Sequence, residues 1–200
     1  AVETLERAPA YSGRTIHPRS DVFARHFTAH YDRGDEPRHV DTFWGNNMGV
    51  RREVFDAVGG WDENMGWGHE EKELAARVRS QFDILYDPEL VVTHSYADSV
   101  PGYWRKIYKL ETQHPYYWRK IGYSLRQQVA MTLVGALHPK CYVVRGVTGS
   151  FVKAGAQLAR TAGRIKGLFG LLGEDSATLD SGVPSFENST AQANPTTTTE

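Results

Sequence analysis

Two adjacent carboxylates in the middle of the chain have the residue types and spacing needed for acid–base chemistry. Glu70 and Glu71 follow the turn Trp67-Gly68-His69 and open a run of helix-forming residues that ends near Gln81. A structural explanation exists, because the first turn of a helix has unpaired N–H groups and a partial positive charge that favour acids. A carboxylate beside a cleft can also take the proton of an attacking hydroxyl. Glu71 and Glu70 are therefore candidate catalytic residues.

Several sequence blocks surround these acids in a fixed order. They are Gly45-Asn46-Asn47, Arg51 to Phe55, Gly59 to Glu63 and Trp67 to Leu74, followed by His94 after the apolar run Leu90-Val91-Val92. In this order they resemble the second half of the catalytic domain of GT-A fold, family 2-like glycosyltransferases and the C-terminal segment of galactosyltransferases. The resemblance extends from about Phe43 to Tyr96.

The resemblance implies a reaction and a set of roles. The reaction is inverting transfer of a sugar from a nucleotide-sugar donor to a hydroxyl of a glycan or lipid-linked acceptor. Glu71 would be the base and Glu70 would bind substrate hydroxyls, although relatives commonly have Asp at the second position. The implied substrate-binding residues are Gly45, Asn46, Asn47, Asp62, Trp67, Gly68 and His69, and His94 would ligate a divalent metal, Mn²⁺ or Mg²⁺.

Two features of such enzymes do not occur in this sequence. One is the D-x-D motif that completes the metal site, and the other is the N-terminal half of alternating strands and helices that holds the nucleotide. We therefore expect an α/β fold, a partial GT-A (Rossmann-like) domain lacking its N-terminal nucleotide-binding half. The chain would be a portion of a larger enzyme or half of a split one, and its metal site would be incomplete.

Local patterns place these residues on a few elements. We expect a loop over 1–20, a strand over 40–44, a helix over 51–58 and a second helix over 70–81. The second helix would bury Leu74 and Val78 and pair Arg77 with Glu73. Short strands are expected over 83–85 and 90–93, on either side of a turn at Asp87-Pro88.

Composition narrows the classes of protein. The 200 residues have a net charge of −1, which argues against nucleic acid as a partner, and 40% of them are hydrophobic, enough for a core. A single cysteine, Cys141, excludes a disulfide framework and a cysteine-based zinc site, and it fits a reducing compartment. The longest apolar run, 129–137, is too short to span a bilayer. We expect a cytoplasmic protein, with a peripheral position on the inner membrane face as the further expectation.

Composition changes after residue 100, which suggests three regions: the partial catalytic domain (1–100), a basic helical extension (101–172) and a disordered tail (173–200). The motif Y-W-R-K-I occurs at 103–107 and 117–121, on helices broken near His114-Pro115. In 151–172 an apolar stripe of Phe151, Gly155, Leu158, Ala162, Ile165, Phe169 and Leu172 lies opposite Lys153, Arg160 and Arg164. Such a helix suits an anionic membrane surface, or it packs on the catalytic part or on a partner helix. The alternative function is a non-catalytic module that binds a membrane or a partner enzyme through these helices.

Overall fold

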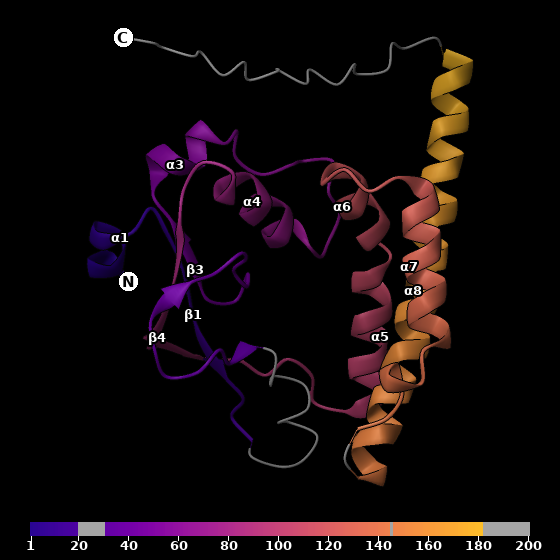
Figure 1. Cartoon of the computed structure of the whole chain (residues 1–200), viewed down its shortest axis with the longest axis horizontal. Helices are drawn as coiled ribbons and strands as arrows, with labels where there is room; N and C mark the ends of the chain where they lie inside the picture. Colours follow the sequence, from indigo (N-terminus) through magenta and orange to yellow (C-terminus); the bar gives the residue numbers. More distant parts are fainter. Residues whose placement is uncertain (20–30, 145, 182–200) are drawn as a thin grey trace, which may run out of the picture.

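The computed structural model describes residues 1–19, 31–144 and 146–181 (Figure 1). It is a mixed α/β structure, with a four-stranded sheet on one side and a column of helices on the other. In chain order the elements are α1 (Val2–Arg7), β1 (Ala10–Ile16), β2 (Arg38–His39), β3 (Met48–Val50), α3 (Arg52–Ala57), α4 (Glu70–Arg79), β4 (Ile84–Thr93), α5 (Val100–Glu111), α6 (His114–Lys120), α7 (Leu125–Leu137), the 3₁₀ helix η2 (Pro139–Cys141) and α8 (Val147–Ser181).

The sheet has the strand order β2-β4-β1-β3. Its central pair, β1 and β4, is parallel, whereas β3 and β2 run antiparallel to their neighbours. The prediction of a loop over 1–20 is therefore wrong, because this stretch contains α1 and the strand β1. The sequence does not indicate β1, because half-buried strands are recognised by alternating apolar residues. Here that alternation is interrupted by Gly13 and by the buried polar residues Ser12 and Thr15.

The two short strands predicted around Asp87-Pro88 form one strand, β4, with a local irregularity. Gly13 lies opposite Asp87, but the next residue, Arg14, lies opposite Val91. The intervening residues bulge from the ladder, which explains how a proline fits in a paired strand. The strand predicted over 40–44 is also not formed, and Phe43 of that segment is instead fully buried in the core.

The helices predicted over 51–58 and 70–81 are confirmed as α3 and α4. Leu74 and Val78 are fully buried, and Arg77 donates to both carboxylate oxygens of Glu73 at 2.8 and 2.5 Å. The core between these helices and the sheet consists of Ala10, Phe43, Val54, Val58, Leu74, Ala75, Val78 and Ile84. This core fixes the start of α4, and with it Glu70 and Glu71, relative to the sheet.

The helices α5 to α8 stand beside the sheet as a column in which α8 is the longest element (Figure 1). The predicted break near His114-Pro115 is confirmed, because α5 ends at Glu111 and α6 begins at His114. α8 continues to Ser181, past the expected end at Leu172, and residues 182–200 of the predicted tail lie outside the described residues. Within the described residues, no helix is long and apolar enough to cross a membrane.

The apolar stripe of α8 faces outward, so the alternative in which this stripe packs on the catalytic part is wrong. Phe151, Leu158 and Phe169 of the stripe are 62%, 62% and 70% exposed. Arg160 and Arg164 point inward and donate to the buried carboxylate of Glu111. The buried residues of α8 are Gly149, Val152, Ala156, Gln157, Gly163, Leu168 and Leu171. The inward turn of the arginines follows from this ion pairing, which a hydrophobicity pattern does not register.

Candidate functional site

A cavity of about 500 Å³ lies between the start of α4 and the helices α5 and α8. Its lining residues come from six parts of the chain: Tyr31, Trp44, Gly45, Asn46, Trp67, Gly68, Glu70, Glu71, Lys72, His94, Tyr96, Tyr103, Lys106, Ile107, Leu110, Glu111 and Arg160. Seven of the ten residues selected from the sequence line it, namely Gly45, Asn46, Trp67, Gly68, Glu70, Glu71 and His94. His94 directly follows β4, and its N–H donates to the carbonyl of Ile16 at 2.9 Å, so the cavity lies at the carboxyl ends of the parallel strands.

A tight turn sets the direction in which α4 enters this wall. Gly68 and His69 both have left-handed backbones, with φ of 108° and 68°. A Cβ on Gly68 would lie 2.7 Å from Cδ1 and 3.3 Å from Cα of Leu110, so only glycine allows the turn to approach α5 this closely. The Glu70 carboxylate accepts the N–H of Gly68 at 2.6 Å. Glu70 therefore stabilises the turn at the helix start, in addition to lining the cavity.

Of the three acids that line the cavity, Glu71 has the fewest hydrogen bonds to its carboxylate. Within the part of the chain that the structure describes, no other residue hydrogen-bonds to it. Burial raises the pKa of Glu71, and the negative charge of Glu70 adds to this effect. A hydrogen bond from the backbone N–H of Glu71 and the positive charge of Lys72 act in the opposite direction, but the pKa is raised overall. A Cβ on Gly45 would lie 3.7 to 3.9 Å from the Glu71 side chain, which shows how closely the glycine passes. A partly desolvated carboxylate with a raised pKa is suited to accept a proton near neutral pH.

Glu70 and Glu71 also border a second cavity, of about 540 Å³. Its other lining residues are Gly45, Met48, Gly49, Val50, Phe55, Trp61 and Leu74. Trp61 is 47% exposed and packs edge-on against Phe55, with 5.8 Å between ring centroids. The two carboxylates thus stand between a charged cavity and an apolar, aromatic one, an arrangement that lets one carboxylate reach two bound molecules.

Three cations line the charged cavity and were not selected from the sequence. The Lys72 ammonium lies 5.4 Å from the centre of the Trp44 ring, and burial lowers its pKa. Lys106 donates to the carbonyl of Tyr96 at 3.0 Å, and Arg160 reaches the cavity from α8. The position of Lys72 next to Glu71 could have indicated this lysine from the sequence, whereas nothing in the local sequence indicated that Arg160 of α8 would reach the cavity.

Three selected residues lie away from this cavity and serve the fold. Asn47 donates from Nδ2 to the carbonyls of Arg14 and Leu90, at 2.9 and 2.7 Å, and so fills the irregularity between β1 and β4. Asp62 accepts from Tyr116 at 3.0 Å and pairs with Lys120 at 3.1 Å, which ties the loop before α4 to α6. Short polar side chains bond readily to nearby groups of the fold, which sequence spacing does not reveal.

His69, the third, is 1% exposed and packs between aromatic rings. Its ring lies 4.4 Å from that of His114 and is stacked at 5.8 Å on that of Tyr117. Burial lowers the pKa of His69 to about 2, so the ring is neutral, and the charge of Lys72 adds to this effect. His69 therefore forms part of the contact between α4 and α6.

The described residues do not build a metal site around His94. His94 lines the cavity, and burial lowers its pKa, with the charges of Lys106 and His17 acting in the same direction. Among the residues described, the one group of three close donors of the types that bind metals is His69, Glu111 and His114. His94 is outside that group.

The Glu111 carboxylate of this group already accepts three hydrogen bonds, two of them from arginines. Glu111 accepts from His114 Nδ1 at 2.6 Å, from Arg160 Nε at 3.0 Å and from Arg164 Nε at 2.7 Å. Two atoms 2.6 Å apart share a hydrogen and are too close to be neighbouring ligands of one ion at about 2.1 Å each. A cation would also have to displace two guanidinium groups. The group is an ion network that joins α5, α6 and α8.

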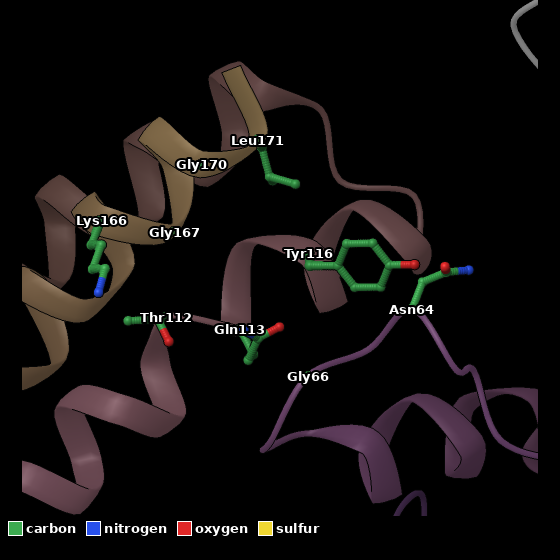
Figure 2. A pocket seen from close by; sticks show the side chains of 9 residues that line it. All are labelled: Asn64, Gly66, Thr112, Gln113, Tyr116, Lys166, Gly167, Gly170 and Leu171. Carbon is green, nitrogen blue, oxygen red and sulfur yellow. The ribbon is translucent and has the colours of Figure 1, made fainter. Parts of the chain in front are cut away.

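A further cavity of about 710 Å³ lies between the loop before α4, the α5–α6 junction and α8 (Figure 2). Figure 2 shows Asn64 and Gly66 on one side and Lys166, Gly167, Gly170 and Leu171 on the other, with Thr112, Gln113 and Tyr116 between them. It is the larger cavity, but no carboxylate or histidine lines it. It therefore lacks the groups for proton transfer that the cavity at Glu71 has.

The comparison with protein families matches one segment of the chain. Residues 25–84 match the family described as the N-terminal domain of galactosyltransferase. The matched stretch contains Gly45, Asn46, Glu70 and Glu71, whereas His94 and the helices α5 to α8 lie beyond it. The match supports a glycosyltransferase of the GT-A-like class, although its description does not name the C-terminal segment that the sequence blocks suggested. No curated protein and no solved structure matches the chain.

Proposed function

We propose that this chain takes part in inverting transfer of a sugar from a nucleotide-sugar donor to an acceptor hydroxyl, with Glu71 as the base. Glu71 accepts the hydroxyl proton as the acceptor oxygen forms its bond to the anomeric carbon and the bond to the leaving diphosphate breaks. The observation that carries the proposal is the Glu71 carboxylate, which stands between two cavities without a hydrogen-bonding side chain among the described residues. A displacement between two substrates requires a base at their meeting point.

The walls of the two cavities suit the two substrates. The carboxamide of Asn46 is buried at the charged cavity, and no described residue hydrogen-bonds to its Nδ2 or Oδ1. A buried polar group without a partner costs free energy that a substrate hydroxyl can recover. Lys72, Lys106 and Arg160 provide positive charge for the phosphates of a nucleotide sugar. The aromatic cavity with Trp61 offers a flat apolar wall for the acceptor sugar ring.

The test is the substitution Glu71→Gln in the full-length protein, after a panel of nucleotide sugars has identified the donor by its hydrolysis. Gln keeps the size of the side chain but cannot take a proton at neutral pH. We expect the transfer rate to fall by about 10²- to 10⁴-fold, because that is the usual contribution of a general base. Donor affinity, measured by titration calorimetry, should change little.

Asp62→Asn is the matched control, because Asp62 is an acid of the same matched segment that lies away from the cavity. Its transfer rate should stay within a few-fold of that of the parent protein. Unchanged transfer in the Glu71→Gln variant would disprove the assignment of the base and would favour the non-catalytic alternative.

A further inference from the structure

The outer helices of the molecule expose an unusual number of large apolar side chains. On α7 these are Leu125, Val129, Leu133, Val134 and Leu137, with exposures of 39% to 78%. On α8 they are Phe151, Leu158, Ile165, Phe169 and Leu172, with exposures of 42% to 70%. Figure 1 shows both helices at the edge of the molecule that is farthest from the sheet. Clustered exposed apolar residues of this size mark a surface that contacts something other than water.

The charge of these helices is strongly one-sided up to residue 173, after which α8 contains Glu174, Asp175 and Asp180. Residues 101–173 contain twelve lysines and arginines and a single acid, Glu111, which is 4% exposed. Among the described residues of this region, the exposed charges are therefore all positive: Arg105, Lys109, Arg119, Lys120, Arg126, Lys140 and Lys166. Arg126 lies between Leu125 and Val129 of α7, Lys140 follows Leu137 of α7, and Lys166 follows Ile165 of α8. The net charge of −1 for the whole chain hides this asymmetry.

We propose that the exposed apolar face of α7 and α8 lies on an anionic lipid surface, with the flanking lysines and arginines at the headgroups. Apolar side chains reach the boundary of the acyl chains, while basic residues are attracted by the negative surface potential. A second copy of this chain fits less well, because a two-fold contact through the same face would bring these cations together. Residues 182–200 contain few apolar residues and only two acids, Glu187 and Glu200, and so offer little to cover the face.

The test is flotation of the purified full chain with lipid vesicles. We expect the protein to float with vesicles of phosphatidylcholine and phosphatidylglycerol at a 7:3 ratio, to float poorly with pure phosphatidylcholine, and to be released by high salt. The double variant Leu133→Glu/Phe169→Glu should lose at least about tenfold in binding, because two exposed apolar side chains no longer enter the bilayer. The control Val2→Glu/Val91→Glu adds the same charge at exposed positions of the sheet side, and its binding should stay within a few-fold.

A second variant tests the electrostatic part without changing an apolar residue. Arg126→Gln/Lys140→Gln/Lys166→Gln should lower binding to the anionic vesicles by roughly a hundredfold, at about fivefold for each basic residue. Absence of flotation with anionic vesicles, or unchanged flotation of Leu133→Glu/Phe169→Glu, would overturn the proposal. So would a dimer, seen by light scattering in the absence of lipid, that Leu133→Glu/Phe169→Glu dissociates. None of these readouts depends on sugar transfer, so the membrane proposal and the proposed function fail separately.

Discussion

At the scale of single residues, the position of Glu71 predicts a conflict between function and stability. Burial raises the pKa of Glu71, so folding opposes ionisation of this carboxyl. As pH rises from the ordinary pKa of a glutamate through that of the folded protein, the unfolded chain releases the proton first and the free energy of unfolding falls. Glu71→Gln removes this cost and should stabilise the protein at pH 7.5 by on the order of 1 kcal/mol. Chemical denaturation at several pH values measures the difference, which should vanish near about pH 4.

Glu70→Gln is the matched comparison for this prediction. The Glu70 carboxylate accepts the N–H of Gly68 at the start of α4, so its loss should lower stability by about 0.3–1 kcal/mol. Stabilisation by both substitutions would mean that general relief of negative charge, and not burial at position 71, is responsible.

The order of the sequence blocks was enough to select seven residues that line one cavity, because the residues of one block lie close together in the fold. It did not determine the direction of individual side chains. Asn47, adjacent to Asn46, turns to the carbonyls of Arg14 and Leu90, and the His69 ring turns into the contact with His114. Such choices depend on partners that are distant in the sequence, here 33 residues or more, and a local motif does not contain them.

At the scale of helices, Glu111 holds three elements together. Burial alone would raise the pKa of Glu111, but the hydrogen bond from His114 and the charges of Arg164 and Arg160 lower it overall, so the carboxylate is ionised. Glu111→Gln would leave two inward-facing guanidinium groups without their counter-charge and should cost about 3–5 kcal/mol. The measurement is the free energy of unfolding at pH 7.

The pH dependence distinguishes this ion network from simple packing. Since the pKa of Glu111 is lower in the folded state, its stabilisation is present above the ordinary pKa of a glutamate and is lost as pH falls below it. The deficit of Glu111→Gln should therefore shrink in acid. Glu53→Gln, at a side chain that is 72% exposed and 3.9 Å from Arg51, should change stability by less than about 0.5 kcal/mol. Equal effects of the two substitutions would contradict the role given to Glu111.

The same network explains why the existence of α8 could be predicted and its orientation could not. The apolar period in 151–172 predicts a helix, but it did not decide whether the stripe packs on the catalytic part or faces outward. The sequence did contain one indication of this orientation, since Glu111 is the single acid among the lysines and arginines of 101–173. A buried carboxylate requires basic partners, so some of these residues had to face inward. Arg160 and Arg164 pair with Glu111, and the apolar stripe on the opposite side of α8 therefore lies at the surface.

At the scale of the whole molecule, the helical column and the sheet side should unfold together. α5 and α8 complete the cavity at Glu71, and Tyr96, Tyr103, Ile107, Val152 and Ala156 form a second core cluster with Tyr31 that joins residues on either side of position 100. Residues 1–100 alone would expose Tyr31 and Tyr96, the two members of this cluster that they contain. The regions 1–100 and 101–172 that composition suggests are therefore expected to behave as one cooperative unit.

Two glycines of α8 provide a paired test of this cooperativity. A Cβ on Gly163 would lie 2.5 Å from the main-chain oxygen of Tyr108 on α5, whereas a Cβ on Gly170 would meet nothing within 4 Å. Gly163→Ala should push α8 away from α5 and destabilise the protein by about 1–3 kcal/mol. Gly170→Ala should stabilise it by up to about 1 kcal/mol, because alanine is the better helix former. If the molecule is one unit, Gly163→Ala will lower the hydrogen-exchange protection of the distant strand β1 as much as that of α8. Protection lost in α8 alone would show instead that the helices unfold independently of the sheet.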